Sequence, residues 1–199
     1  MLPNTAAIIT EFETLIGSAT ELSSDDELKL LNKIYFQVLR QKAWEFLKKE
    51  ASGTISGTDI TQPADFFRMA DEPVIYIGQY HNPFKLIPFT ERRLYTNQNN
   101  NAYYDARQEK FVFFRTQNDT YTFDYLYTPD ALTTSGSDPV FPQQFWGMLP
   151  FLMASDADAI ELTDKARSYA IENKARGNQI LTDMEIWNDA LTMMTTYGS

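Results

Sequence analysis

Helical hydrophobic spacing occurs at both ends of this chain, while the middle consists of short β-type runs separated by Asn-, Gly- and Pro-rich breaks. Apolar residues recur every three or four positions over residues 5–16 and 28–47, which predicts two amphipathic helices. After Ala51 the sequence changes to alternating and β-branched residues, which favour strands. Helical spacing returns after residue 143 and is expected to continue to about Tyr197.

These patterns predict an α+β fold in which a helical bundle, formed by the N- and C-terminal helices, carries a central β-rich insertion. The expected division is residues 1–50 for the N-terminal helices, 51–130 for the insertion, and 131–199 for C-terminal helices that pack with 1–50. A chain of 199 residues, 43% of them hydrophobic, is long enough to bury one core of this kind.

The second helix has a clear start signal. Ser24 and Glu27 have the spacing of a capping box, and acidic residues follow where the helix dipole favours negative charge. From there the apolar spacing predicts a helix to about Lys49. Trp44 and Phe46, near its end, are expected to be core residues that pack the helix against the β region.

Two residues weaken the C-terminal helical pattern. Pro150 lies within the helix expected over residues 143–154, and it should kink or interrupt that helix unless it falls in the first turn. Gly177 lies within the apolar stripe of residues 157–197, so that stripe is compatible with two helices or with one bent helix.

The central region contains a polar stretch at residues 96–110, which predicts a loop at the tip of a strand pair. A second break lies at residues 128–142. It contains Pro129, Gly136, Pro139 and Pro142, which all oppose regular structure. Alternating aromatic residues predict two facing strands, Phe111 and Phe113 on one and Tyr121, Phe123 and Tyr125 on the other.

Composition excludes several classes of function. The absence of cysteine excludes disulfide frameworks, thiolate zinc sites and cysteine nucleophiles. A formal net charge of −10 argues against an electrostatic footprint on nucleic acid. No run of about 18 apolar residues is present and no signal peptide is evident, so we expect a protein outside the membrane, made in the cytoplasm.

The sequence contains no catalytic motif that we recognise, and we expect no catalytic residue, no metal and no cofactor. The only histidine, His81, lies in a turn-prone stretch, and G-x-S-x-G, H-E-x-x-H and GxxxxGK[ST] are all missing. Asp156, Asp158 and Glu161 lack the glycine and the twelfth-position Glu of an EF-hand loop, and they are expected to form a solvated helix start.

The order of short motifs along the chain resembles the head-to-tail adaptor, or tail tubular, proteins of short-tailed phages. In these proteins a helix closes with Trp and Phe, and a strand leads into a P-x-D-F turn; the matching residues here are Trp44, Phe46, Pro63, Asp65 and Phe66. A Y-x-Y-x-P strand end and a proline-rich helix start follow, matched here by Tyr125, Tyr127, Pro129, Asp138, Pro139, Pro142, Phe145 and Ala154. Trp146 and Pro150 depart from the pattern, which leaves the subgroup open.

The resemblance implies a structural virion protein of the phage neck, made in the host cytoplasm. Such a protein forms a homo-oligomeric ring, expected to be a dodecamer, between the portal protein and the tail or nozzle proteins. DNA passes through the lumen during ejection without specific binding, and no catalysis is implied. A first adaptor and a second neck-ring protein both fit this description.

Two groups of residues are candidates for partner contact under this hypothesis. For the portal or a neighbouring subunit we nominate Trp187, Met193, Met194 and Tyr197, since Met and aromatic side chains adapt to irregular surfaces. For the tail-facing side we nominate the segment from Asn97 to Tyr104, namely Asn97, Asn99, Asn100, Asn101, Tyr103 and Tyr104.

Two other classes of function remain open on sequence. Asp119, Asp124 and Asp130 lie among tyrosines, as in a carbohydrate-binding or carbohydrate-active module that uses the tyrosine-rich strand. Tyr125→Ala would abolish glycan binding in that case. A cytosolic regulatory domain with a soluble partner is the third class.

Overall fold

The computed structural model divides the chain into two compact units, which are described separately below. Unit 1 comprises Met1–Phe46 and Asp130–Ser199, and unit 2 comprises Leu47–Pro129. The structure describes residues 2–16, 22–70, 73–79, 82–95, 100–134, 137–158 and 164–197, and it describes the side chains of these residues except for 158, 164–167 and 194–197.

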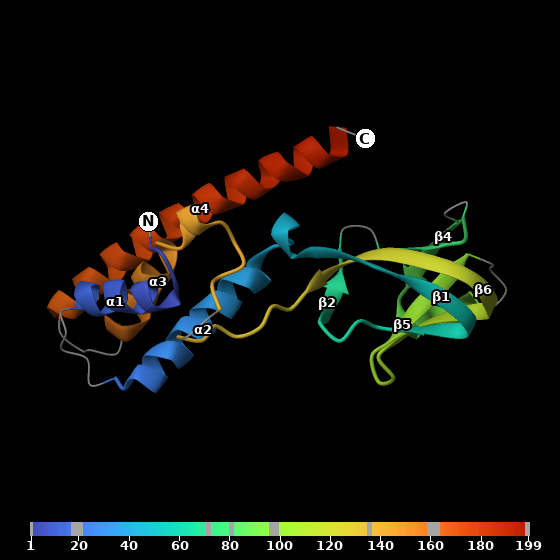
Figure 1. Cartoon of the computed structure of the whole chain (residues 1–199), viewed down its shortest axis with the longest axis horizontal. Coiled ribbons are helices and arrows are strands. Elements are labelled where there is room, and N and C mark those ends of the chain that lie inside the picture. The colour runs from blue at the N-terminus through green and yellow to red at the C-terminus, as the bar shows by residue number, and fades with distance from the viewer. Residues whose placement is uncertain are drawn as a thin grey trace. The chain divides into compact units, whose positions relative to one another are not determined.

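Figure 1 shows the elements of each unit. Unit 1 contains α1 (Thr5–Ile16), α2 (Ser24–Gln41), the short 3-10 helices η1 (Glu45–Leu47, at its boundary) and η3 (Gln143–Phe145), α3 (Met148–Asp158) and α4 (Asp164–Tyr197). Unit 2 contains β1 (Lys48–Thr61), β2 (Phe66–Met69), β3 (Val74–Ile77), β4 (Asn82–Ile87), the 3-10 helix η2 (Phe89–Leu94), β5 (Asn101–Asp105) and β6 (Lys110–Tyr127).

The predicted fold class, a helical bundle with a β-rich insertion, is wrong. The protein is α+β, but its helical segments precede and follow a β-rich unit that contains a closed barrel of four strands, and no helical bundle is shown. In unit 1 the main helix contacts involve α3, which packs on α1, α2 and α4. The terminal helices are therefore gathered around a short central helix.

The α2 helix begins where the sequence predicts, although a neighbouring residue caps it. Ser23, rather than Ser24, is the N-cap, and its Oγ accepts a hydrogen bond from the backbone N–H of Asp26 at 3.3 Å. The same Oγ donates to the Asp26 carboxylate at 2.7 Å, so Asp26 takes the role that we expected of Glu27. Glu27 is instead a buried residue.

The prediction that this helix continues to about Lys49 is wrong, because α2 ends at Gln41. The Trp44 indole N–H donates to the carbonyl of Val38 at 3.1 Å, which satisfies an acceptor in the last turn. The backbone N–H of Glu45 donates to Oδ1 of Asn188 on α4 at 2.7 Å. The second bond ties Glu45, which lies in a stretch of local helical spacing, to a distant residue on α4.

The core of unit 1 is formed by side chains from its four α-helices and from the segments next to η1 and η3. Its largest buried members are Ile8, Phe12, Leu31, Tyr35, Trp44, Phe141, Trp146, Leu149, Met153 and Met184. The Trp44 and Phe46 rings stack at 5.5 Å, and Phe46 contacts Phe141 at 6.3 Å. These two aromatic residues thus pack on one another and on Phe141 within unit 1, as core residues.

Pro150 and Gly177 both occur in continuous helices. Pro150 is in the first turn of α3, where a missing backbone N–H leaves no hydrogen bond unmade. α4 runs as one helix through Gly177, where a Cβ atom would lie 2.7 Å from Cδ2 of Leu152 on α3. The glycine therefore permits close packing of α3 on α4.

The barrel in unit 2 is closed by β6, which pairs with two other strands of the ring. β6 is antiparallel to β3 at Tyr121 and Thr122, and antiparallel to β5 at residues 110–113. β3 and β4 are antiparallel, and β4 and β5 are parallel. β1 runs along β6 with a register shift at Gly57, whose φ is +140°, and such a bulge bends a strand pair.

The closed barrel corrects two local predictions. The aromatic residues expected on two facing strands all belong to β6, where Phe111, Phe113, Phe123 and Tyr125 point into one core. The polar stretch expected to be a loop contains β5, which is paired on both edges, and the turn before β6 is confined to residues 106–109. Pairing with distant strands decides both outcomes.

Candidate functional site

The nominated C-terminal residues all lie on α4. Trp187 is half-buried and its ring contacts that of Phe145 at 5.8 Å, so it is part of the packing of unit 1. Met193 is 64% exposed. The side chains of Met194 and Tyr197 are outside the described part of the chain. Of the nominated residues whose side chains the structure describes, Met193 is the exposed one, and its side chain can therefore contact a partner.

One face of α4 carries exposed apolar and acidic side chains. Ile186 is 64% exposed, and Met193 follows it by seven residues, which places both on the same face of the helix. Asp183 and Asp189, three residues before and after Ile186, are also exposed. We call Asp183, Ile186, Asp189 and Met193 the acidic–apolar patch. Ile171, nearer the start of α4, is exposed as well.

The acidic groups of this patch have neighbours on their own unit. The carboxylate of Asp183 accepts a hydrogen bond from Nε2 of Gln179 at 3.2 Å. Asp189 forms an ion pair with Lys42, just after the end of α2. Asp183 is therefore the more available of the two charges for a partner.

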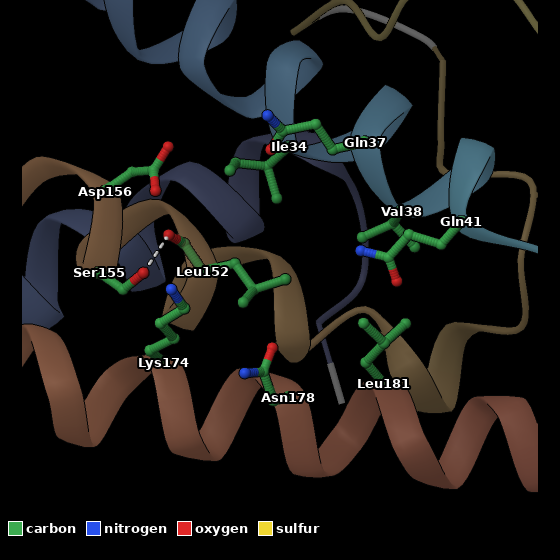
Figure 2. Close-up of a pocket in the computed structure, with 10 residues that line it drawn as sticks. All are labelled: Ile34, Gln37, Val38, Gln41, Leu152, Ser155, Asp156, Lys174, Asn178 and Leu181. Atoms are coloured by element: carbon green, nitrogen blue, oxygen red, sulfur yellow. Dashed lines mark hydrogen bonds between the residues drawn. The ribbon is translucent and has the colours of Figure 1, made fainter.

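A pocket of about 190 Å³ opens between α2, α3 and α4 in unit 1 (Figure 2). Its apolar lining consists of Ile34, Val38, Leu152 and Leu181, and its polar lining of Gln37, Gln41, Ser155, Asp156, Lys174 and Asn178. The side chains come from all three helices and point toward the same space (Figure 2). The sequence analysis did not anticipate this pocket, since three helices of wide sequence separation build it.

Two polar groups that line the pocket have partners within unit 1. The Ser155 hydroxyl donates to the carbonyl of Leu152 at 3.1 Å, as serines in helices commonly do. Asp156 forms an ion pair with Lys33 at 2.8 Å. The lining of the pocket can accept an apolar group with polar edges.

The nominated tail-facing residues have different positions in unit 2. Asn97 and Asn99 are outside the described residues, and Asn100 is exposed just before β5. Asn101, Tyr103 and Tyr104 are residues of β5 itself, half-buried. The Tyr104 hydroxyl donates to Oε1 of Gln62 and its ring contacts Phe111, so Tyr104 packs against the core.

Tyr103 belongs to a different environment, next to η2. Its ring lies edge-on to Phe89 at 5.6 Å and contacts Phe114 at 5.6 Å. The Arg92 guanidinium lies 3.7 Å from the centroid of the Phe89 ring and donates to the Phe89 carbonyl at 2.7 Å. The exposed Phe89 ring is thus held in place from two sides.

The same short helix exposes a further cation and a large apolar side chain. Arg93 is exposed, and Leu94 is 78% exposed. We call Phe89, Arg92, Arg93 and Leu94 the basic–apolar patch. This patch could not be predicted from the sequence, because a two-arginine segment following a short strand gives no periodic signal.

The tyrosine-rich strand is occupied by packing. Tyr125 is 5% exposed and lies in the core of unit 2, while Tyr121 and Tyr127 pack against that core. Tyr121 stacks on Phe123 at 6.0 Å. In this fold the Tyr125 ring offers no face to a sugar, so no observation on the described residues favours the carbohydrate hypothesis.

Asp65, in the P-x-D-F turn, joins three strand ends of unit 2. Its carboxylate accepts hydrogen bonds from Lys49 at 2.7 Å and from the Tyr125 hydroxyl at 2.8 Å. The bond from Lys49 lowers the pKa of Asp65 below its ordinary value, and the bond from Tyr125 acts in the same direction. Burial, together with the hydrogen bond to Asp65, raises the pKa of Tyr125 to about 12.

Negative charge is distributed unequally between the units. Unit 1 contains 17 Asp and Glu against 8 Lys and Arg, whereas unit 2 contains 10 against 9. Nearly all of the net charge of −10 therefore resides in unit 1.

Asp156 and Asp158 were expected to begin a helix, but they are in the last turn of α3, so that prediction is wrong. His81 and Glu161 are outside the described residues, and no group of three or more His, Asp or Glu side chains in the described part could hold a metal ion. Within the same residues, no helix is both long enough and apolar enough to span a membrane. Neither a protein-family model nor a curated protein matches the chain.

Proposed function

We propose that this protein is a structural virion protein, a phage head-to-tail adaptor that forms a ring between the portal and the tail and lines the DNA channel. The observation that carries the proposal is the outer face of α4, which exposes Ile171, Ile186 and Met193. Exposed apolar side chains gathered on one element are typical of protein contact surfaces.

The shape of this surface suits assembly. α4 is 34 residues long, and one side of it packs on α3 through buried residues such as Leu181 and Met184. The opposite side is left for a neighbour, and methionine adapts to a neighbouring surface at little strain. A long helix with a buried face on α3 and exposed apolar side chains on its outer side can therefore join one copy to the next, or to the portal.

The charge distribution also supports the proposal. A channel surrounded by many copies of the acidic unit 1 would repel phosphate, so DNA would pass without binding. The Trp187, Met193, Met194 and Tyr197 segment is the proposed contact with the portal or the neighbouring copy. The segment from Asn97 to Tyr104 is the proposed contact with tail or nozzle proteins.

The proposed partners and location define the test. Tagged protein would be isolated from a lysate of the source system and imaged by negative-stain microscopy. Rings attached to portal-like cones, of about twelve subunits, are the expected result. A monomer that brings no virion protein with it would contradict the proposal.

A substitution on the outer face of α4 tests whether this face makes the contacts of the ring. Ile186→Glu should abolish ring formation, because it introduces a charge into an apolar contact. Asn178→Glu, an added charge at an exposed position of α4 that lies about 80° around the helix from Ile186, is the matched control and should leave the rings intact. Circular dichroism would verify that both variants are folded.

A further inference from the structure

The acidic–apolar patch of α4 and the basic–apolar patch of η2 have complementary chemistry. The first combines Ile186 and Met193 with Asp183 and Asp189, and the second combines Phe89 and Leu94 with two arginines. The larger apolar side chains of both are exposed, Leu94 most of all. The α4 patch is negatively charged and the η2 patch carries arginines, so their charges are complementary, and both patches expose apolar area that a contact could bury.

The distribution of charge restricts which surfaces of two copies can meet. The unit 1 of one copy repels the unit 1 of another copy, since each carries a net charge of about −9 by its count of acidic and basic residues. Unit 2 is nearly neutral overall, and its η2 helix carries two positive charges, Arg92 over the Phe89 ring and Arg93, against the single negative charge of Glu91. Contact between unit 2 of one copy and unit 1 of another therefore avoids the strongest repulsion.

We propose that the η2 basic–apolar patch of one copy docks on the α4 acidic–apolar patch of the next copy. Because the two surfaces are different, the contact is head-to-tail, and a head-to-tail contact generates a ring when its rotation closes. The inference rests on the proposed ring function and names the surfaces that build the ring. Arg93 faces Asp183, and Leu94 lies against Ile186 and Met193.

Cross-linking provides the experiment, since the chain has no cysteine of its own. Leu94→Cys and Met193→Cys are introduced together, and the purified protein is treated with a short bismaleimide. A ladder of covalent oligomers on a denaturing gel is expected, because each copy carries one thiol on each side of the contact. Leu94→Cys alone and Met193→Cys alone should give no ladder.

A matched control tests the position of the contact along α4. Leu94→Cys combined with Ile171→Cys places the second thiol on an exposed residue of the same helix, fifteen residues before Ile186. This pair should cross-link at least about tenfold less than the pair with Met193→Cys. Equal cross-linking of both pairs would overturn the inference.

Charge reversal gives an independent readout. Arg93→Glu should reduce the cross-linking of the double-cysteine protein about tenfold, because it places like charges together. Asp183→Arg in the same chain should restore it. Arg68→Glu, an exposed arginine on β2, is the control for added negative charge and should change nothing.

The outcomes separate this inference from the proposed function. Rings on portal-like cones without a covalent ladder would overturn the docking surfaces and leave the adaptor function intact. A cross-linked species that migrates as a monomer would show a contact within one chain and overturn the inference. Absence of both rings and ladder would overturn the two proposals together.

Discussion

Single residues hold the turn region of unit 2, and Asp65 is the clearest case. It accepts from Lys49 and Tyr125, while its backbone carbonyl accepts from the N–H of Thr128 at 2.8 Å. Asp65→Asn should lower the free energy of unfolding by about 1–2 kcal/mol at pH 7, as expected for loss of a charge-assisted hydrogen bond. Urea denaturation followed by fluorescence would measure it.

The pKa of Asp65 gives this effect a defined dependence on pH. Because the folded-state pKa lies below the unfolded value, the stabilisation is complete above the unfolded pKa and is lost as the pH falls through the folded one. The difference between wild type and Asp65→Asn should therefore shrink below pH 4. Asp124→Asn, an exposed neighbour of Tyr125 on β6, should show no such pattern, and an equal effect there would contradict the assignment.

Gly177 sets how closely α3 and α4 approach. Alanine is the better helix former by about 1 kcal/mol, but its Cβ would lie 2.7 Å from Cδ2 and 2.8 Å from Cγ of Leu152. Overpacking typically costs about 1–3 kcal/mol, so we expect Gly177→Ala to be net destabilising by about 1 kcal/mol in thermal unfolding.

The matched control for this prediction is Gly147→Ala. There the added Cβ would meet Cδ1 of Ile180 at 3.8 Å, an ordinary van der Waals distance. The variant should be close to neutral. If Gly177→Ala raised the melting temperature, helix propensity would outweigh the contact with Leu152 and the close-packing argument would fail.

At the level of elements, Asn188 connects α4 to the segment that follows α2. It is 1% exposed, its Oδ1 accepts from the N–H of Glu45, and its Nδ2 donates to the carbonyl of Ala43 at 3.5 Å. Asn188→Ala leaves the half-buried N–H of Glu45 without its acceptor and removes a buried polar side chain from its partners, which should cost about 1–3 kcal/mol in chemical denaturation. Asn178→Ala, at an exposed position of α4, should cost less than about 0.5 kcal/mol.

The same contact explains which elements sequence reasoning could predict. α1 and the start of α2 follow from local spacing and capping, which are properties of neighbouring residues, whereas the helix expected over residues 143–154 begins only at Met148. The end of α2 does not follow from local spacing, since Glu45 just beyond it is tied to Asn188, more than 140 positions away. β5 was missed for a similar reason, since its polar sequence becomes a strand only between β4 and β6.

The candidate surfaces also divide into those that the sequence could indicate and those that only the folded chain defines. Met193 could be nominated from composition and position near the end of the chain, and it is exposed. The pocket between α2, α3 and α4 and the patch on η2 could not, since each depends on residues or exposure that only the folded chain defines. The tyrosine strand offered sequence evidence for a binding site, and the structure shows that one of its tyrosines, Tyr125, is buried in the core.

At the scale of the whole molecule, unit 2 has the properties of an independently folding segment. It is continuous in sequence, and its buried core cluster is made of its own residues. Lys48 pairs with Leu126, so the two ends of the segment are neighbours in the sheet. We therefore expect a fragment of residues 47–129 to fold alone, with a dispersed amide spectrum and cooperative unfolding in urea.

A shorter fragment tests why the boundary lies at residue 47. Residues 51–130, the insertion expected from sequence, lack Lys49 and the first three pairs of β1 with β6. Loss of the Lys49–Asp65 contact and of this pairing should lower the free energy of unfolding of this fragment by about 2–3 kcal/mol relative to 47–129. Equal stability of the two fragments would show that the strand ends around Asp65 contribute little, and an unfolded 47–129 fragment would show that the barrel depends on unit 1.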